Sequence, residues 1–285
     1  MLNKFKEKYI YIYAICIALL FKAAQILSTY PEKLLEKTSL YPSDETAKFF
    51  FSMVITDLIV VIVMLLVLWA TKHLYLLKKK GTGFIKGLSI GSYQIVFSSL
   101  IMAFMIFASI NQGLELNNAF NIIVFILCMS LVGISEELCC RALIAQSLLE
   151  HCGTSKKALW KAAIISGVIF GLLHLFNMKS QNPISTIAQA IMASATGIMY
   201  ATIYFRSGNI WALVFLHALN DISAASAFGL FRGMDLLSAF QAKSDGSVFQ
   251  ILILAIPELI VAAYLLRDKK LNEIQETWPE IKNKQ

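Results

Sequence analysis

Apolar residues run through this chain in long blocks separated by short polar stretches. About twenty consecutive apolar residues cross the hydrocarbon core of a bilayer as a helix. We find eight candidate blocks, and the fourth continues beyond its apolar part into a charged motif. They are Tyr9–Ser28, Phe49–Thr71, Leu88–Leu114, Phe120–Ile134, Ala158–Phe176, Ser185–Phe205, Ile210–Leu230 and Val248–Leu266. The pattern predicts an all-α fold, a polytopic membrane helical bundle of about eight transmembrane helices.

The composition agrees with a membrane protein. The 285 residues are 58% hydrophobic and 15% charged, whereas about a quarter of the residues in a soluble domain are charged. The net charge of +7 raises the question of nucleic-acid binding. No basic segment is interleaved with aromatic residues on a polar surface, so we expect a lipid bilayer and no nucleic acid as partner. The first block follows lysines but lacks a small-x-small cleavage site, which indicates a retained span.

Lysine and arginine are distributed unevenly between the two sides that eight spans define. One side carries Lys4, Lys6, Lys8, Lys72, Lys78, Lys79, Lys80, Lys86, Lys156, Lys157, Lys161, Arg206, Arg267, Lys269, Lys270, Lys282 and Lys284. The other side carries only Lys33, Lys37, Lys48, Lys179, Arg232 and Lys243. Because positive residues accumulate on the cytoplasmic side of membrane proteins, we expect both termini in the cytoplasm.

The cysteines suggest packing and not chemistry. There are five, none forms a CxxC pair, and most lie inside apolar blocks. They are Cys16, Cys128, Cys139, Cys140 and Cys152. We interpret them as small buried hydrophobic residues. The polar tail Asp268–Gln285 is expected to form a short amphipathic or frayed helix.

Ionisable residues inside the spans are few, and most gather in three clusters at helical spacing. The isolated ones are Lys22 and Glu258, which snorkelling or local pairing can explain, and Asp57, which can cap or pair between helices. The clusters are Glu136, Glu137 and Arg141; Phe170 and His174; and His217, Asn220 and Asp221. Charges in apolar surroundings are costly unless they are paired or used, so the clusters need an explanation.

Helix geometry divides the first cluster. Glu137 and Arg141 are i,i+4, share a face and can form an ion pair. Glu136 lies about 100° round the helix and has no such partner. An unpaired carboxyl of this kind is suited to exchange protons, as a general base must. A structural charge network at the end of a span is the alternative.

The other two clusters carry imidazoles. Phe170 can shield His174 from lipid at i,i+4, and Asp221 can orient His217 at the same spacing. Either histidine alone can equally be a hydrogen-bonding group between helices. Three clusters on three spans, with a Glu, two His and an Asn/Asp pair, indicate one inward-facing site.

The three motifs resemble those of the CPBP intramembrane proteases, the CAAX protease and bacteriocin-processing or ABI family. Glu136-Glu137-x-x-x-Arg141 resembles the EExxxR motif, Phe170-x-x-x-His174 the FxxxH motif, and His217-x-x-x-Asp221 the HxxxN/D motif. The resemblance covers roughly 120–230, which we assign as a catalytic core. Residues 1–119 would supply three N-terminal spans, and 231–285 the last span and cytoplasmic tail.

The resemblance implies a role for each motif residue. Glu136 would activate water, His174 would help hold it, and Glu137 with Arg141 would organise the site. His217 and the residue at 221 would stabilise the oxyanion. The family often has Asn where this chain has Asp221, and a carboxylate donates only when protonated, so Asp221 is expected to orient His217, with Asn220 beside it.

The metal requirement stays open at this stage. Glu136, His174 and His217 form an acceptable zinc set, and family members are often labelled metalloproteases. No HExxH motif is present, and a glutamate-dependent hydrolase without metal is the alternative. The cofactor is therefore zinc or none.

The leading hypothesis is a CAAX-type intramembrane endopeptidase that hydrolyses membrane-associated peptides or CAAX-like protein tails. The resemblance and the lack of targeting extensions suggest a multi-pass protein of a bacterial inner membrane. A non-catalytic bacteriocin-immunity or binding protein of the same fold is the second hypothesis. A proton-coupled transporter is the third, but we see no inverted repeat.

Overall fold

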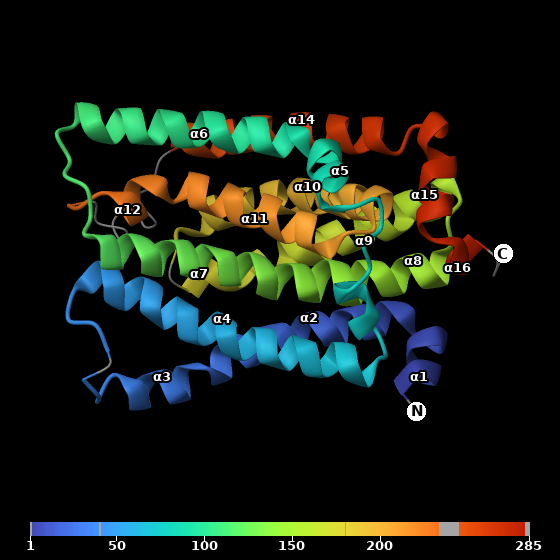
Figure 1. The fold of residues 1–285 in the computed structure, drawn as a ribbon, viewed down its shortest axis with the longest axis horizontal. Coiled ribbons are helices and arrows are strands. Elements are labelled where there is room, and N and C mark those ends of the chain that lie inside the picture. The colour runs from blue at the N-terminus through green and yellow to red at the C-terminus, as the bar shows by residue number, and fades with distance from the viewer. Residues whose placement is uncertain (1, 40, 180, 234–244, 283–285) are drawn as a thin grey trace.

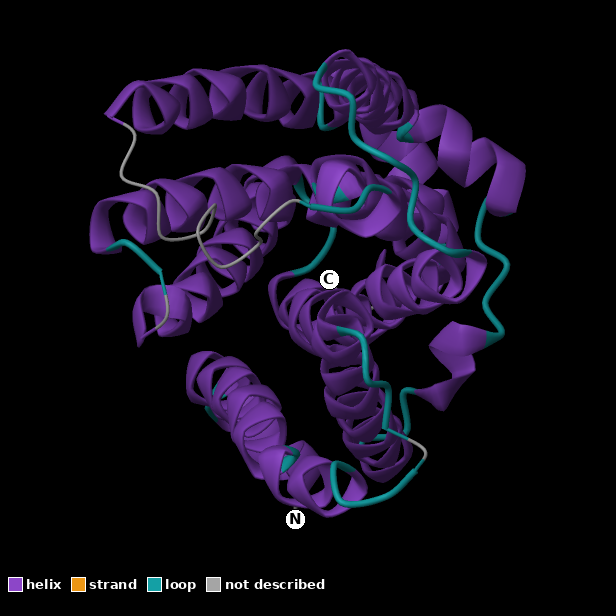
Figure 2. Cartoon of the chain, turned by 90° about the vertical axis from the view of Figure 1, so that its left-hand side faces the viewer, coloured by secondary structure: helices purple, strands orange, loops and turns teal. Residues whose placement is uncertain are grey.

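The computed structural model describes residues 2–39, 41–179, 181–233 and 245–282. This part of the chain is a bundle of helices, with one isolated antiparallel bridge between Leu116 and Phe231 (Figures 1 and 2). The helices are α1 Leu2–Lys8, α2 Ile10–Leu27, α3 Thr29–Leu35, α4 Glu45–Ala70, η1 Leu74–Leu77, α5 Phe84–Ile90, α6 Ser92–Asn111, α7 Ala119–Glu137, η2 Leu138–Ala145, α8 Gln146–Cys152, α9 Lys156–His174, η3 Leu175–Lys179, α10 Pro183–Ser207, α11 Ile210–Ala224, α12 Ser226–Leu230, α14 Asp245–Leu265, η4 Asp268–Lys270, α15 Leu271–Thr277 and α16 Pro279–Lys282.

The prediction of a polytopic helical membrane bundle is confirmed. Six helical stretches are long and apolar enough to cross a bilayer: Ile10–Leu35, Glu45–Ala70, Ser92–Asn111, Ala119–Cys152, Lys156–Met178 and Pro183–Ser207. Two shorter apolar helices, Ile210–Ala224 and Ile253–Leu265, fall in the last two predicted blocks. The third block differs from the prediction, because Gly91 separates α5 from α6. The seventh also differs, because α11 already ends at Ala224.

Polar residues between the blocks fix where several long helices begin. The side chains of Asp44, Asn118, Ser155, Asn182 and Asn209 each accept a hydrogen bond from a backbone N–H in the first turn of α4, α7, α9, α10 and α11. Such N-caps satisfy donors that have no partner inside the helix. The short polar stretches between blocks therefore set the register of the helices that carry the three clusters.

Helix α10 lies at the centre of the bundle and α6 at its edge. Of the apolar window of α10, 72% is buried, against 17% for α6. Helix α10 packs against α9 on one side and α14 on the other, which can be followed in Figure 1. The exposed side of α6 is formed by Leu100, Phe104, Phe107 and Ile110. An apolar outer face of this kind is stable against lipid and not against water.

Glycines let the helices that carry the clusters approach closely. A Cβ on Gly167 of α9 would lie 2.6 Å from the backbone nitrogen of Ile198 in α10, and one on Gly197 would lie 2.8 Å from Cα of Gly167. At Gly133 of α7 a Cβ would lie 3.1 Å from the backbone nitrogen of Ala218 in α11. Small residues at such crossings are typical of membrane helix packing. They bring α9 against α10 and α7 against α11.

The described part of the C-terminal tail forms the short helices α15 and α16, which bury Ile274 and Ile281, so of the two expectations the amphipathic helix agrees with the structure and the frayed helix does not. Trp278 is fully buried, and its indole Nε1 donates to the Phe205 carbonyl oxygen over 2.8 Å. Arg206 pairs with Glu273 at 2.8 Å, and the Lys79 ammonium lies 3.5 Å above the Trp278 ring. The tail thus folds back onto the end of α10. Helices α1 and α16 lie at the same end of the bundle (Figure 1), as an even number of spans requires.

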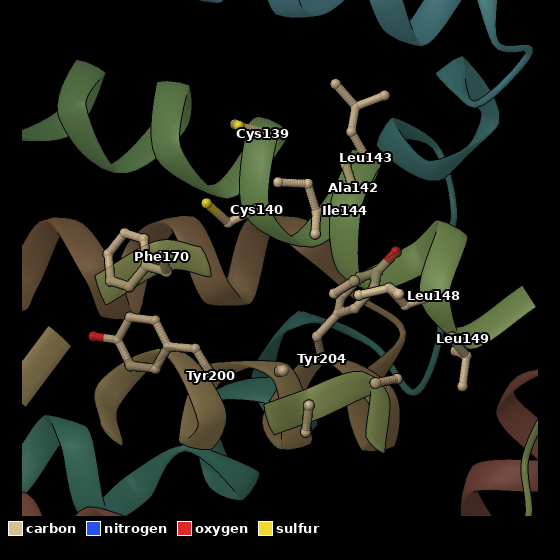
Figure 3. Packing of buried hydrophobic residues seen from close by; sticks show 14 of the residues in the cluster. Cys139, Cys140, Ala142, Leu143, Ile144, Leu148, Leu149, Phe170, Tyr200 and Tyr204 are labelled. Atoms are coloured by element: carbon tan, nitrogen blue, oxygen red, sulfur yellow. The ribbon is translucent and has the colours of Figure 1, made fainter. Parts of the chain in front are cut away.

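The cysteines occupy different environments. Cys128, Cys139 and Cys140 are buried, as expected, whereas Cys152 is half-buried and Cys16 is exposed. Cys139 and Cys140 lie in the main apolar cluster, which also contains Phe170 and Tyr200 (Figure 3). The interpretation of the cysteines as buried packing residues is therefore right for three of the five and wrong for Cys16. Lys243 and Lys284, used above to orient the chain, lie outside the described residues.

Candidate functional site

The first cluster lies where the helix geometry changes. Glu136 and Glu137 are the last two residues of α7, and Arg141 belongs to η2, a π-helical stretch of eight residues. π-Helical insertions widen the turn and occur frequently at functional sites. The wider turn follows directly after the two carboxylates. No pattern in the sequence indicated it.

Glu137 and Arg141 are completely buried and paired. Their side chains have an exposed fraction of 0%, and Nη1 of Arg141 lies 2.9 Å from Oε1 of Glu137. The ion pair expected from the i,i+4 spacing is therefore present. Removing both charges from water is costly, and further polar contacts must stabilise the pair. One is the Gly197 carbonyl of α10, which accepts from Nη2 of Arg141 at 3.4 Å.

Two aromatic rings complete the surroundings of Arg141. The centre of its guanidinium lies 4.7 Å from the Phe170 ring and 5.2 Å from the Tyr200 ring. Cation–π contacts of this kind stabilise a desolvated cation. Tyr200 also stacks edge-on against His217 at 5.4 Å. Sequence reasoning missed Tyr200, because it is one aromatic residue among many in an apolar block.

The buried pair also orients the imidazole of α11. Oε1 of Glu137 accepts a hydrogen bond from Nδ1 of His217 over 2.7 Å. Because a carboxylate only accepts, Nδ1 carries a proton, and Nε2 is the nitrogen left to act on a ligand. Asp221 was expected to orient His217, but its Oδ2 lies 3.5 Å from Nε2, on the other side of the ring. The closer orienting carboxylate is Glu137.

Glu136 lies on the open side of the same imidazole. Its Oε2 is 3.4 Å from Nε2 of His217, longer than a good hydrogen bond. Its side chain is 16% exposed and that of Asp221 is 21% exposed, whereas Glu137 is sealed. The two neighbouring glutamates therefore differ in access. Glu136 can be reached by water or a peptide, and Glu137 cannot.

His174 joins the cluster through Phe170. Its Nδ1 lies 3.0 Å from the Phe170 carbonyl oxygen, and the Phe170 ring contacts both imidazoles, at 4.9 Å from His174 and 5.8 Å from His217. A carbonyl can only accept, so Nδ1 is protonated and Nε2 is free to accept from a water. The Phe170 ring thus packs against both imidazole rings.

The amide of Asn220 is fixed from a helix that sequence reasoning did not connect to the site. Nε2 of Gln94, on α6, donates to Oδ1 of Asn220 and to Oγ of Ser98, each over 2.9 Å. Asn220 must then present its NH2 group on the other side, where Nδ2 lies 3.5 Å from Oδ1 of Asp221. Gln94 is fully buried. A buried glutamine in an apolar block was the signal available in the sequence.

The isolated ionisable residues lie at different distances from the cluster. Asp57 of α4 is buried and accepts a hydrogen bond over 2.7 Å from Ser135, the residue before Glu136. Lys22 of α2 donates a hydrogen bond to Gln25 at 2.9 Å and interacts electrostatically with Glu136. Glu258 of α14 accepts from Thr196 at 2.5 Å, on the far side of α10. The pairing between helices suggested for Asp57 is present, but its partner is a serine.

The zinc set considered above does not come together as a metal site. In the described part of the chain, no three His, Cys, Asp or Glu side chains are arranged so that they could hold a metal ion. In both His174 and His217 the Nδ1 nitrogen is held, by the Phe170 carbonyl and by Glu137, and Nε2 is free, which suits a metal-ligating histidine as well as a metal-free acid–base group. We therefore assign no step of a reaction to a metal.

Comparison with known proteins gives one match. Residues 118–223 match the family model described as type II CAAX prenyl endopeptidase Rce1-like. The matched region begins at the N-cap of α7 and ends within α11, so it contains all three clusters. No curated protein and no solved structure matched the chain. Lys22, Asp57 and Gln94 lie outside the matched region.

Proposed function

We propose that this chain, whose residues 118–223 match the model described as type II CAAX prenyl endopeptidase Rce1-like, is an intramembrane endopeptidase that uses Glu136 to activate water. One observation carries the proposal. An accessible carboxylate faces the free nitrogen of an imidazole whose other nitrogen is held by the buried Glu137–Arg141 pair. A base and a fixed hydrogen-bonding group, side by side within a membrane bundle, are what peptide hydrolysis needs.

The reaction begins with a water between Glu136 and His174. Glu136 accepts one proton of this water, and Nε2 of His174 accepts a hydrogen bond from the other. The oxygen of the water attacks the peptide carbonyl carbon and forms a tetrahedral intermediate. When the C–N bond breaks, the proton held by Glu136 passes to the leaving nitrogen. The products are one peptide with a new carboxylate and one with a new amine.

The negative charge of the intermediate develops on the former carbonyl oxygen. The NH2 group of Asn220, fixed by Gln94, is a donor that can face this oxygen. Nε2 of His217 is a second donor when it carries a proton. Asp221 accepts from Asn220 and lies beside Nε2 of His217, and so acts as a positioning residue. Preorganised donors of this kind are commonly worth about 3 kcal/mol each in the transition state.

The substrates follow from the surroundings of the site. Apolar helices enclose the cluster, so the peptide must reach it from the bilayer or its edge. Membrane-associated peptides and CAAX-like protein tails meet this condition. With the positive span ends in the cytoplasm, both termini are cytoplasmic, and we place the protein in a bacterial inner membrane.

The proposal is tested by incubating the purified protein in lipid vesicles with membrane-anchored peptides and identifying the products by mass spectrometry. Wild-type protein should produce two fragments from one peptide, and Glu136→Gln and His174→Ala should reduce the rate at least 100-fold. Glu45→Gln, on the exposed start of α4, is the matched control and should cleave as wild type does. Full activity of Glu136→Gln would remove this residue from the chemistry.

A parallel arm contains a chelator, because CAAX-type proteases include enzymes labelled as metal-dependent. Unchanged cleavage agrees with a glutamate base acting alone. A binding or immunity protein of the same fold is the competing function. Protection of cells against a membrane-active peptide that persists in Glu136→Gln, together with no cleavage by wild-type protein, would favour that function.

A further inference from the structure

Lys22 is an ammonium group inside the apolar helix α2. It lies 12 residues after Ile10 and 5 before Leu27, the two ends of α2, roughly 18 and 8 Å from them at about 1.5 Å per residue. A lysine near a helix end can extend its side chain to the membrane surface. The Lys22 side chain instead contacts Gln25 and the ring of Phe176, just after α9, so its ammonium lies at a contact between helices. A cation held between the helices of a membrane bundle marks a functional site by default.

The ammonium has no ion-pair partner in the described part of the chain. Its nearest polar contact is neutral, the Gln25 amide oxygen at 2.9 Å. Two rings lie at 5.8 Å, those of Phe21 and Phe176. The carboxylates whose charges act on it are Glu136 and then Asp57. A desolvated cation without a counter-ion is costly, so an anionic ligand would be strongly attracted to it.

Lys22 lies beside the proposed catalytic residues. Phe176, which it contacts, follows His174 by two residues, and α2 packs against α4, η2 and α9. The side chain is half-buried and can therefore be reached. Arg141, the other cation at the cluster, is fully buried and paired with Glu137. An anionic group that enters the site meets the carboxylates of Glu136 and Asp221, and Lys22 is the accessible cation that can offset their repulsion.

We propose that Lys22 is a substrate-binding residue whose ammonium pairs with the C-terminal carboxylate of the peptide. Every peptide ends in such a carboxylate unless it is modified, whereas acidic side chains depend on sequence. When Lys22 holds the C-terminal carboxylate of the substrate, the number of residues between the scissile bond and the end of the peptide is fixed. The enzyme then selects peptide ends over internal loops. This inference rests on the proposed peptidase function for its role in cleavage but not for binding.

The test uses two membrane-anchored peptides that differ only in a C-terminal carboxylate or a C-terminal amide. Binding is measured by fluorescence anisotropy and cleavage by mass spectrometry, with the full-length protein in lipid vesicles. Wild-type protein should bind the carboxylate form about tenfold more tightly, and the preference should appear in KM more than in kcat. Lys22→Met should bind both forms equally, and Lys22→Arg should retain the preference.

Controls separate the possible outcomes. Lys161→Met removes a lysine from the start of α9 and should keep the preference. If Lys22→Met does not accumulate, Lys22→Gln is a neutral polar replacement and carries the same expectation. Equal binding of both peptides by wild-type protein overturns this inference and leaves the peptidase proposal intact. A preference in binding without cleavage of either peptide supports the inference and contradicts the peptidase proposal.

A third peptide, amidated and carrying one aspartate near its end, identifies the source of the carboxylate. It should bind as weakly as the plain amide. If it binds more tightly than the peptide with the free C-terminus, the assignment to the chain end is overturned.

Discussion

Oε1 of Glu137 lies 2.7 Å from Nδ1 of His217 and 2.9 Å from Nη1 of Arg141. One buried oxygen thus joins the end of α7, the π-helical η2 and the middle of α11. The contact links residues 80 positions apart. It fixes the orientation of an imidazole in which the other nitrogen faces Glu136.

Replacing Glu137 by Gln should therefore damage both stability and activity. The amide leaves Arg141 charged and unpaired in the interior, which typically costs about 3–5 kcal/mol. We expect a clear drop in the midpoint of thermal unfolding and at least a 100-fold loss of kcat. Glu150→Gln tests whether any carboxylate with a cationic partner has this effect. The Glu150 side chain is 20% exposed and pairs with Lys6. The Glu150→Gln variant should lose stability but still cleave the peptide. Equal loss of cleavage in both variants would contradict the role of Glu137.

Tyr200 should act through its ring and not its hydroxyl. The ring contacts Arg141 and His217, whereas the hydroxyl makes one long hydrogen bond of 3.4 Å to the Leu216 carbonyl. Tyr200→Phe should retain at least half of the wild-type kcat. Tyr200→Leu should lose about 30-fold, because cation–π contacts at desolvated sites contribute about 2 kcal/mol. Equal rates for the two variants would show that the ring contact has no role in cleavage.

Gln94 should act as a positioning residue for Asn220. Gln94→Glu keeps the shape but has no N–H to donate, so the Asn220 amide can turn and lose its facing NH2 group. We expect kcat to fall about tenfold with KM little changed. Ser98→Ala removes the other acceptor of Gln94 and should have a much smaller effect. A double-mutant cycle with Asn220→Ala measures the coupling, and additive losses would contradict positioning through Asn220.

The docked tail should detach in acid. Burial raises the pKa of Glu273, but hydrogen bonds from Lys270 and Arg206 outweigh this and hold the pKa below its ordinary value of 4.5. The contact therefore stabilises docking fully above about pH 4.5 and is lost as the pH falls through the lowered value. Fluorescence of Trp278, with Trp69, Trp160 and Trp211 replaced by Phe, follows the detachment.

Glu273→Gln provides the comparison for this titration. Its tail should dock less firmly at neutral pH and should show no transition in the same acid range. If the variant titrates as wild type does, another group controls the docking.

Patterns within one helix were readable in the sequence, and contacts between helices were not. The apolar blocks predicted the spans, because a bilayer requires a minimum apolar length. The spacing of Glu137 and Arg141 predicted their ion pair, because i and i+4 share a face. Which face of one helix meets which face of another depends on packing, so the spacing of His217 and Asp221 suggested an orienting pair, while Glu137 is the closer partner.

Two further features had no local signal. The π-helical turn after Glu137 depends on the surrounding packing, and Trp278 looked like part of a polar tail. Its indole donates a hydrogen bond to the carbonyl of Phe205, and the Lys79 ammonium lies over its ring. Both partners are far away in the sequence.

The distribution of the site over the chain also sets the order in which it is assembled during synthesis. Chains emerge from the ribosome N-terminus first, so Lys22, Asp57 and Gln94 are made before Glu136. The pair of Glu137 with Arg141 can form as soon as η2 is complete, because both residues lie within one turn of the same helical stretch. His217 and Asn220 arrive about 80 residues later, with α11. A nascent chain therefore lacks two of the residues of the proposed site until its seventh apolar helix has been made, and the proposed peptidase activity would begin only then.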